Sequence, residues 1–78
     1  MNFEERGRNM PGHIYKTVEI TGTSSNSIED AVRNAVSRTS HSLKNLRWFK
    51  LDEIRGKLDQ NHVTEWQATV KISFTVEE

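Results

Sequence analysis

The stretch LRWFKLDEIRGKLDQNHVTEWQATVKISFTV, residues 46–76, decides the fold of this chain. It contains two runs in which apolar and polar residues alternate, from Leu46 to Leu58 and from Val63 to Val76, and this is the pattern of half-buried β-strands. The polar segment between them, residues 59–62, has the composition of a hairpin turn. The stretch therefore predicts an antiparallel β-hairpin.

A tight turn that pairs Asp59 with His62 fixes the register of this hairpin. Phe49 then lies opposite Ile72, and Leu51 lies opposite Val70, so we expect Phe49 and Leu51 in the core. A slip of one residue would bury Lys50 and Asp52 instead, and burying unpaired charges is costly. The first register is therefore preferred.

In this register Trp48 lies on the face that points away from the core, among polar residues. A large aromatic side chain on such a face is expected to meet another subunit or a planar ligand. Gln67, expected opposite Ile54, shares the face but lies about 20 Å from Trp48 along the hairpin. A ligand held by both residues would therefore need two subunits. Taken alone, Trp48 is more often a subunit contact, and Gln67 an ordinary surface residue.

The segments before the hairpin predict one more strand and a helix. HIYKTVEITG, residues 13–22, alternates like a strand with one apolar face. SIEDAVRNAVSRTSHSLKNL, residues 27–46, has Ser27 as a helix N-cap, Asp30 three residues later, and a narrow stripe rich in small residues. We therefore predict an α+β fold of order β-α-β-β, in which one helix lies close against one face of a three-stranded antiparallel sheet.

Length and composition limit what such a chain can be. It has 78 residues and no cysteine, which allows one domain, expected over residues 13–78 after a flexible N-terminal arm, residues 1–12. The three histidines are scattered, so no metal site is expected. Domains this small bury little surface, and oligomerisation is the remaining means of stabilising one.

Charge and motifs exclude several classes of function. Eleven basic and eleven acidic residues give a net charge of zero, which argues against nucleic-acid binding. No apolar run is long enough to span a membrane, and the N-terminus lacks a secretory signal, so a cytoplasmic location is expected. No nucleophile with a base, paired catalytic carboxylates or phosphate-binding glycine loop is present, so we do not expect an enzyme.

The chain resembles the dodecins, a family of small flavin-binding proteins. The resemblance rests on YKTVEITGTS, EDAVRNAVSRTSHSLKNLRWF, DEIRG, WQATVKISF and the terminal acidic pair, in that order. It implies the β-α-β-β fold and a homododecamer, a hollow sphere with helices outside and sheets turned inward. It also implies that flavins bind in pairs at two-fold interfaces, stacked between two symmetry-related tryptophans.

The resemblance also implies roles for individual residues. Trp48 matches the stacking tryptophan, and Gln67 matches a glutamine that binds the polar edge of the flavin ring. Arg47 is a candidate for a flavin phosphate or a subunit salt bridge, and Thr69 for the same pocket as Gln67. Ser73 stands where glycine is frequent and is expected to narrow the pocket.

The implied function is storage and shielding of flavin, as riboflavin, flavin mononucleotide or lumichrome. The alternative is a dodecameric scaffold or carrier without flavin, which binds another ligand such as coenzyme A.

Overall fold

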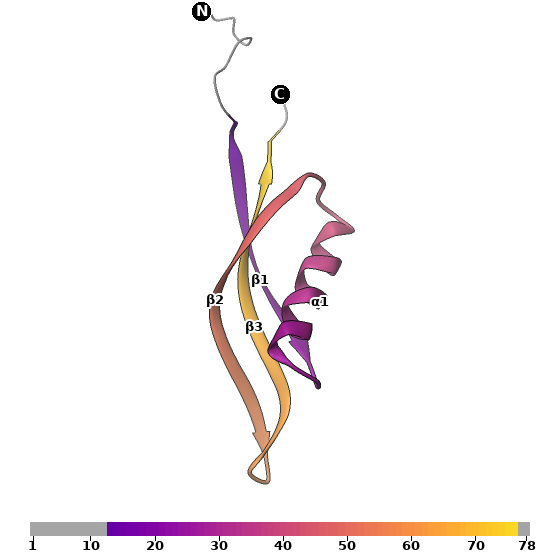
Figure 1. Cartoon of the computed structure of the whole chain (residues 1–78), viewed down its shortest axis with the longest axis vertical. Coiled ribbons are helices and arrows are strands. Elements are labelled where there is room, and N and C mark those ends of the chain that lie inside the picture. The colour runs from indigo at the N-terminus through magenta and orange to yellow at the C-terminus, as the bar shows by residue number, and fades with distance from the viewer. Residues whose placement is uncertain (1–12, 77–78) are drawn as a thin grey trace, which may run out of the picture.

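The computed structural model describes residues 13–76, and the predicted order of elements is confirmed (Figure 1). The elements are strand β1, Tyr15–Ser24, helix α1, Ile28–Ser40, strand β2, Leu46–Asp59, and strand β3, His62–Thr75. The three strands form one antiparallel sheet in the order β1-β3-β2, so the last strand is the central one. The predicted arm, residues 1–12, lies outside the described residues.

The hairpin between β2 and β3 closes with a two-residue turn, as predicted. Asp59 pairs with His62, and the two residues between them have positive φ angles, 51° at Gln60 and 68° at Asn61. Two successive left-handed residues are the mark of a type I′ turn, whose twist suits a β-hairpin. This turn sets the register at the tip.

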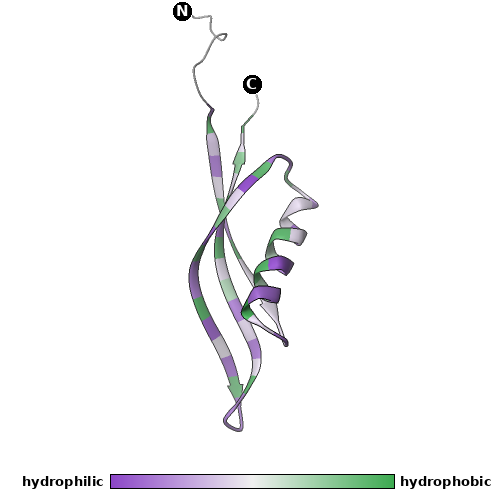
Figure 2. Ribbon diagram, viewed as in Figure 1, coloured by the Kyte–Doolittle hydropathy of each residue, from purple (hydrophilic) through white to green (hydrophobic). Residues whose placement is uncertain are grey.

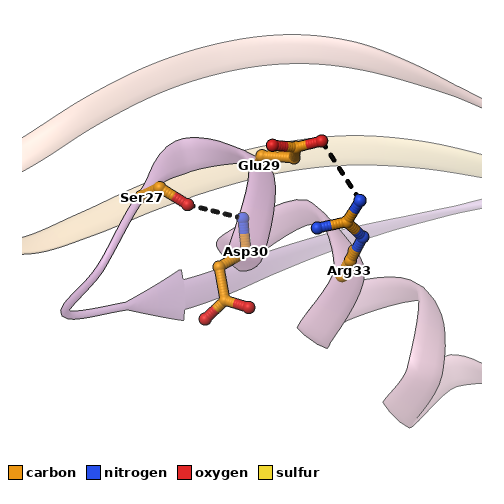
Figure 3. A network of polar contacts seen from close by, with 4 residues as sticks. All are labelled: Ser27, Glu29, Asp30 and Arg33. Atoms are coloured by element: carbon orange, nitrogen blue, oxygen red, sulfur yellow. Dashed lines mark hydrogen bonds and ion pairs between the residues drawn. The ribbon is translucent and has the colours of Figure 1, made fainter.

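Helix α1 begins at its predicted cap. The backbone N–H of Asp30 donates to Ser27 Oγ at 3.0 Å, and Glu29 pairs with Arg33 one turn later (Figure 3). The Asp30 carboxylate does not complete the capping box, because it accepts a hydrogen bond from Ser24 Oγ at 2.8 Å. Asp30 thus ties the end of β1 to the first turn of the helix.

The helix ends earlier than the sequence predicted. The prediction ran from residue 27 to residue 46, but α1 stops at Ser40, and Asn45 has a φ of 64° just before β2. Serine, threonine and histidine are weak helix formers, and they occupy all four positions of residues 39–42. A left-handed residue then turns the chain back toward the sheet.

Small residues let α1 lie close to the sheet, as its stripe predicted. Ala31 and Ala35 of the helix and Ala68 of β3 are buried, and Gly22 of β1 pairs with Ala68. A Cβ atom on Gly22 would collide with the Ala31 carbonyl oxygen and would lie 2.8 Å from the Ala35 Cβ. Glycine is therefore required for the observed distance between β1 and α1.

The expected burial of Phe49 and Leu51 is wrong for the single chain. Both lie on the helix side of the sheet, yet their side chains are 46% and 40% exposed. The helix packs on β1 and β3 and leaves β2 uncovered, so hydrophobic residues recur along β2 without a covering layer (Figure 2). The buried core is correspondingly small, with Val70 and Ile72 as its largest fully buried members.

The register of β2 against β3 is confirmed near Trp48 and wrong near Gln67. Trp48 pairs with Ser73, and Leu51 pairs with Val70, as predicted. An irregularity between Leu51 and Glu53 then shifts the pairing by one residue, so Gln67 lies opposite Arg55 and not Ile54. Strict alternation along β2 would turn Ile54 to the opposite face of the sheet. A β-bulge of this kind keeps it on the apolar face.

Candidate functional site

The open face, defined as the side of the sheet turned away from α1, carries an aromatic pair at one end. Trp48 of β2 and Tyr15 of β1 have ring centroids 4.7 Å apart and planes tilted by 62°. Trp48 remains 50% exposed despite this contact. Half of the surface of the indole is therefore available to another flat group.

Small polar residues lie beneath this aromatic pair on β3. Ser73, the partner of Trp48, is only 3% exposed, and its hydroxyl shares a hydrogen bond of 2.8 Å with Thr17 Oγ1. The Ser73 hydroxyl is thus bonded to the neighbouring strand β1. Whether this residue narrows a ligand pocket stays a prediction.

Gln67 is held in a short chain of polar contacts farther along the open face. Its Oε1 accepts a hydrogen bond from Arg55 Nε at 2.7 Å, and its Nε2 donates to Glu65 Oε1 at 2.9 Å. These two contacts fix which end of the amide points to which neighbour. An amide has a second acceptor position and a second N–H, so Gln67 can still donate and accept.

The remaining candidates, Thr69 and Arg47, lie at opposite ends of the open face. Thr69 follows Gln67 on β3 and shares a hydrogen bond of 2.8 Å with Thr21 of β1. Arg47 donates from Nε to Thr75 Oγ1 at 2.7 Å, next to Trp48. Each candidate residue therefore has a partner within its own chain.

Charged residues occupy the open face between the two ends. Lys50 and Lys71 are directly opposite in the register, and Asp52 Oδ2 lies 3.5 Å from Lys71 Nζ. Glu19 of β1 pairs with Lys71 from the other side. The two lysines and the two acidic residues balance in charge, so this region is neither a basic nor an acidic patch.

A single chain does not bring Trp48 and Gln67 together. Trp48 pairs with Ser73, which lies six residues beyond Gln67 on the same strand. At about 3.3 Å per residue the two positions are about 20 Å apart. The chain therefore places Trp48 and Arg47 at one end of the open face, and Gln67 and Thr69 toward the other.

An apolar hollow lies on the other side of the sheet, at the gap between α1 and β2. It is lined by Val36 of the helix, Ile72 of β3, and the β2 residues Leu46, Arg47, Trp48 and Phe49. The hollow forms where the helix does not reach β2. Its apolar lining suits packing against another chain better than a polar ligand.

The sequence interpretation missed three neighbours of the candidate residues. They are Tyr15, Arg55 and Glu65, which the sequence pattern places in strands without assigning them a role in the site. Arg55 could have been placed opposite Gln67, because the apolar positions of β2 change from odd to even between Leu51 and Ile54. Such a change of phase indicates a bulge.

Metal-binding clusters and membrane-spanning helices are both absent from residues 13–76. This part of the chain holds no group of three or more histidine, aspartate or glutamate side chains able to bind a metal ion. It also contains no helix with the length and apolar character needed to cross a membrane.

Comparison with known proteins assigns the chain to a family. A family model described as Dodecin matches residues 14–77. The dodecin of Thermus thermophilus is 39% identical over 67 residues, which cover 86% of this chain and 97% of the relative. The chain belongs to the dodecin family. The predicted resemblance is thereby confirmed.

Solved dodecin structures agree in fold over nearly their whole length. The dodecin of Streptomyces coelicolor superposes with a TM-score of 0.84 at 40% identity, covering 88% of this chain and 99% of its own. The dodecin of Streptomyces davaonensis gives a TM-score of 0.82 at 39% identity, with coverages of 86% and 98%. The dodecin match includes all four elements and both ends of the open face.

Proposed function

We propose that this dodecin is a flavin storage protein. It binds riboflavin, flavin mononucleotide or lumichrome through the ring system that these molecules share, and it performs no catalysis. The observation that carries the proposal is the half-exposed indole of Trp48 on the open face of a dodecin sheet. Indole is electron-rich and the flavin ring is flat and electron-poor, so stacking buries apolar area and adds an aromatic term of about 0.5–1.5 kcal/mol.

The proposed site lies between subunits of a homododecamer. Two flavin rings stack on each other between two Trp48 side chains, one from each of two subunits, and Gln67 binds the polar edge of the ring. The separation of about 20 Å between Trp48 and Gln67 in one chain supports a site built from two chains. The uncovered apolar side of β2 supports assembly, because single chains seldom expose such a surface.

The chemistry of the residues fits this ligand. The Gln67 amide offers a donor and an acceptor, which match the alternating N–H and C=O groups of the flavin pyrimidine edge. Electron transfer from the indole to the excited ring would quench flavin fluorescence and photochemistry. Storage with quenching is therefore the function that Trp48 and Gln67 support best, in a cytoplasmic protein that binds neither nucleic acid nor membrane.

Titration with riboflavin tests the proposal. We expect strong quenching of flavin fluorescence that saturates near one flavin per subunit, because each subunit supplies one Trp48. Trp48→Ala should abolish the quenching, whereas Trp66→Phe, on the helix side of the sheet, should leave it unchanged. A correctly assembled protein that does not quench riboflavin would contradict the proposal and turn attention to other ligands, such as coenzyme A.

A further inference from the structure

The aromatic pair on the open face joins the two edges of the sheet. Tyr15 lies on β1 and Trp48 on β2, and β3 runs between these strands. Neighbouring strands are about 4.8 Å apart, so the two edge strands are separated by roughly twice that distance. The ring centroids are only 4.7 Å apart, and therefore both rings lean inward over β3.

The central strand leaves room for this contact. At the level of the rings it presents Ser73, the partner of Trp48, and Thr75, the partner of Tyr15. Ser73 is 3% exposed, although it lies on the open face of a single sheet. A larger residue at this position would hold the two rings apart.

Tyr15 has a second aromatic neighbour. The ring of His13 lies 6.1 Å from the Tyr15 ring, at an angle of 51° between the planes. Tyr15 thus contacts both His13 and Trp48. Tilted contacts of this kind are a favoured geometry for aromatic pairs, so they restrict how each ring turns.

Trp48 is only partly enclosed by its own chain. It lies on an edge strand, directly after the irregularity at Arg47, and half of its surface is exposed. An exposed side chain with free torsions loses conformational freedom when a ligand stacks on it, and that loss weakens binding. A contact that fixes the ring beforehand reduces this loss.

We propose that Tyr15 is a positioning residue, which fixes the indole of Trp48 in the orientation needed to stack on a flavin ring. This inference rests on the proposed function and deepens it. Tyr15 acts through its ring, by contact with Trp48, and its hydroxyl is not required. The role belongs to the free protein, before any ligand binds.

The test uses full-length protein with Trp66→Phe, so that Trp48 is the only tryptophan. Tyr15→Phe keeps the ring, and Tyr15→Leu removes it while keeping apolar bulk on the strand. Ile14→Ala is the matched control, because it removes an exposed apolar group at the same end of the sheet. Time-resolved anisotropy of Trp48 without ligand reports the order of its ring, and riboflavin titration reports affinity.

We expect Tyr15→Leu to increase the fast motion of Trp48 and to weaken riboflavin binding about tenfold, as the loss of preorganisation predicts. Tyr15→Phe and Ile14→Ala should stay within about twofold of the parent in affinity and unchanged in anisotropy. Assembly also restricts Trp48, because the proposed site lies between subunits, so the variants are compared only after light scattering shows that each has the same mass as the parent.

Three results would overturn the inference: unchanged Trp48 anisotropy in the Tyr15→Leu protein, unchanged affinity in that protein, or an equal loss of affinity in Tyr15→Phe. The last result would mean that the hydroxyl contacts the ligand directly. A parent protein that does not bind riboflavin would overturn the proposed function itself. A parent that binds it, with a Tyr15→Leu variant that binds equally well, would overturn only the role of Tyr15.

Discussion

At the scale of single residues, the Gln67 amide is the most constrained group of the candidate site. Arg55 and Glu65 contact opposite ends of it, so its donor and acceptor are assigned before any ligand arrives. Trp48 provides a flat surface for stacking, whereas Gln67 provides hydrogen bonds, which require a defined orientation of the ligand. The two residues should therefore affect different observables.

Replacing Gln67 by leucine should lower the affinity for riboflavin without lowering the fluorescence quenching of bound riboflavin. The change removes the amide and leaves an apolar side chain that is one atom shorter. We expect riboflavin binding to weaken by about two- to tenfold, because one lost hydrogen bond is worth about 0.5–1.5 kcal/mol. Quenching at saturation should remain complete, since Trp48 is intact.

The measurement is a riboflavin titration carried to saturation, with Thr64→Ala as control. Thr64 lies on the same strand near the hairpin tip, and its hydroxyl donates a hydrogen bond to the backbone carbonyl oxygen of Lys57. Incomplete quenching at saturation in the Gln67→Leu protein would contradict the division of roles.

At the scale of elements, the contact between α1 and β1 depends on one glycine. Gly22→Ala should destabilise the chain by about 1–3 kcal/mol, the usual cost of overpacking, because the added methyl group meets the backbone of Ala31. Gly56→Ala is the matched control. Its nearest neighbour would be the Glu65 carbonyl oxygen at 3.5 Å, an ordinary contact, so it should be neutral or slightly stabilising.

Urea denaturation at a fixed protein concentration measures both variants. Equal stability of the two would mean that α1 can move away from β1 without loss.

The hairpin turn allows a stabilising change. Gln60 has a φ of 51°, and glutamine has no particular tolerance for that region. Gln60→Asn together with Asn61→Gly gives the residues that type I′ turns favour, and it should stabilise the chain by about 1 kcal/mol. A thermal melt should show a higher midpoint, and a lower one would contradict the assignment of the turn.

The elements also show how far the sequence could predict the structure. The tight turn and strict alternation place Trp48 opposite Ser73, because the irregularities at Lys57/Leu58 and at Leu51/Glu53 shift the pairing in opposite directions and cancel. Between these two irregularities strict alternation fails, and for this reason Gln67 was predicted opposite Ile54. The exposure of Phe49 could not be read from the hairpin, since it depends on which strands the helix covers.

At the scale of the whole molecule, the uncovered side of β2 is the main feature of the single chain. Phe49, Leu51 and Ile54 lie on that side, each at least 40% exposed. A surface of this kind on a small chain marks a protein–protein contact. The apolar hollow beside α1 continues it around Phe49.

A charge placed on this surface should prevent assembly. We expect Ile54→Asp to yield smaller species, because an unpaired carboxylate cannot be buried between subunits. Ser37→Asp, on the exposed side of α1, is the control and should assemble normally. Light scattering measures both. An Ile54→Asp protein that assembles like the parent would mean that β2 does not form the subunit contact.

The central claim is that flavin is held between Trp48 side chains of two subunits. A crystal structure of the complex with riboflavin tests it most directly. The account predicts two stacked flavin rings between two Trp48 indoles from different chains, with the Gln67 amide at the pyrimidine edge of each ring. An assembled protein with riboflavin bound away from Trp48, or held by residues of one chain alone, would contradict it.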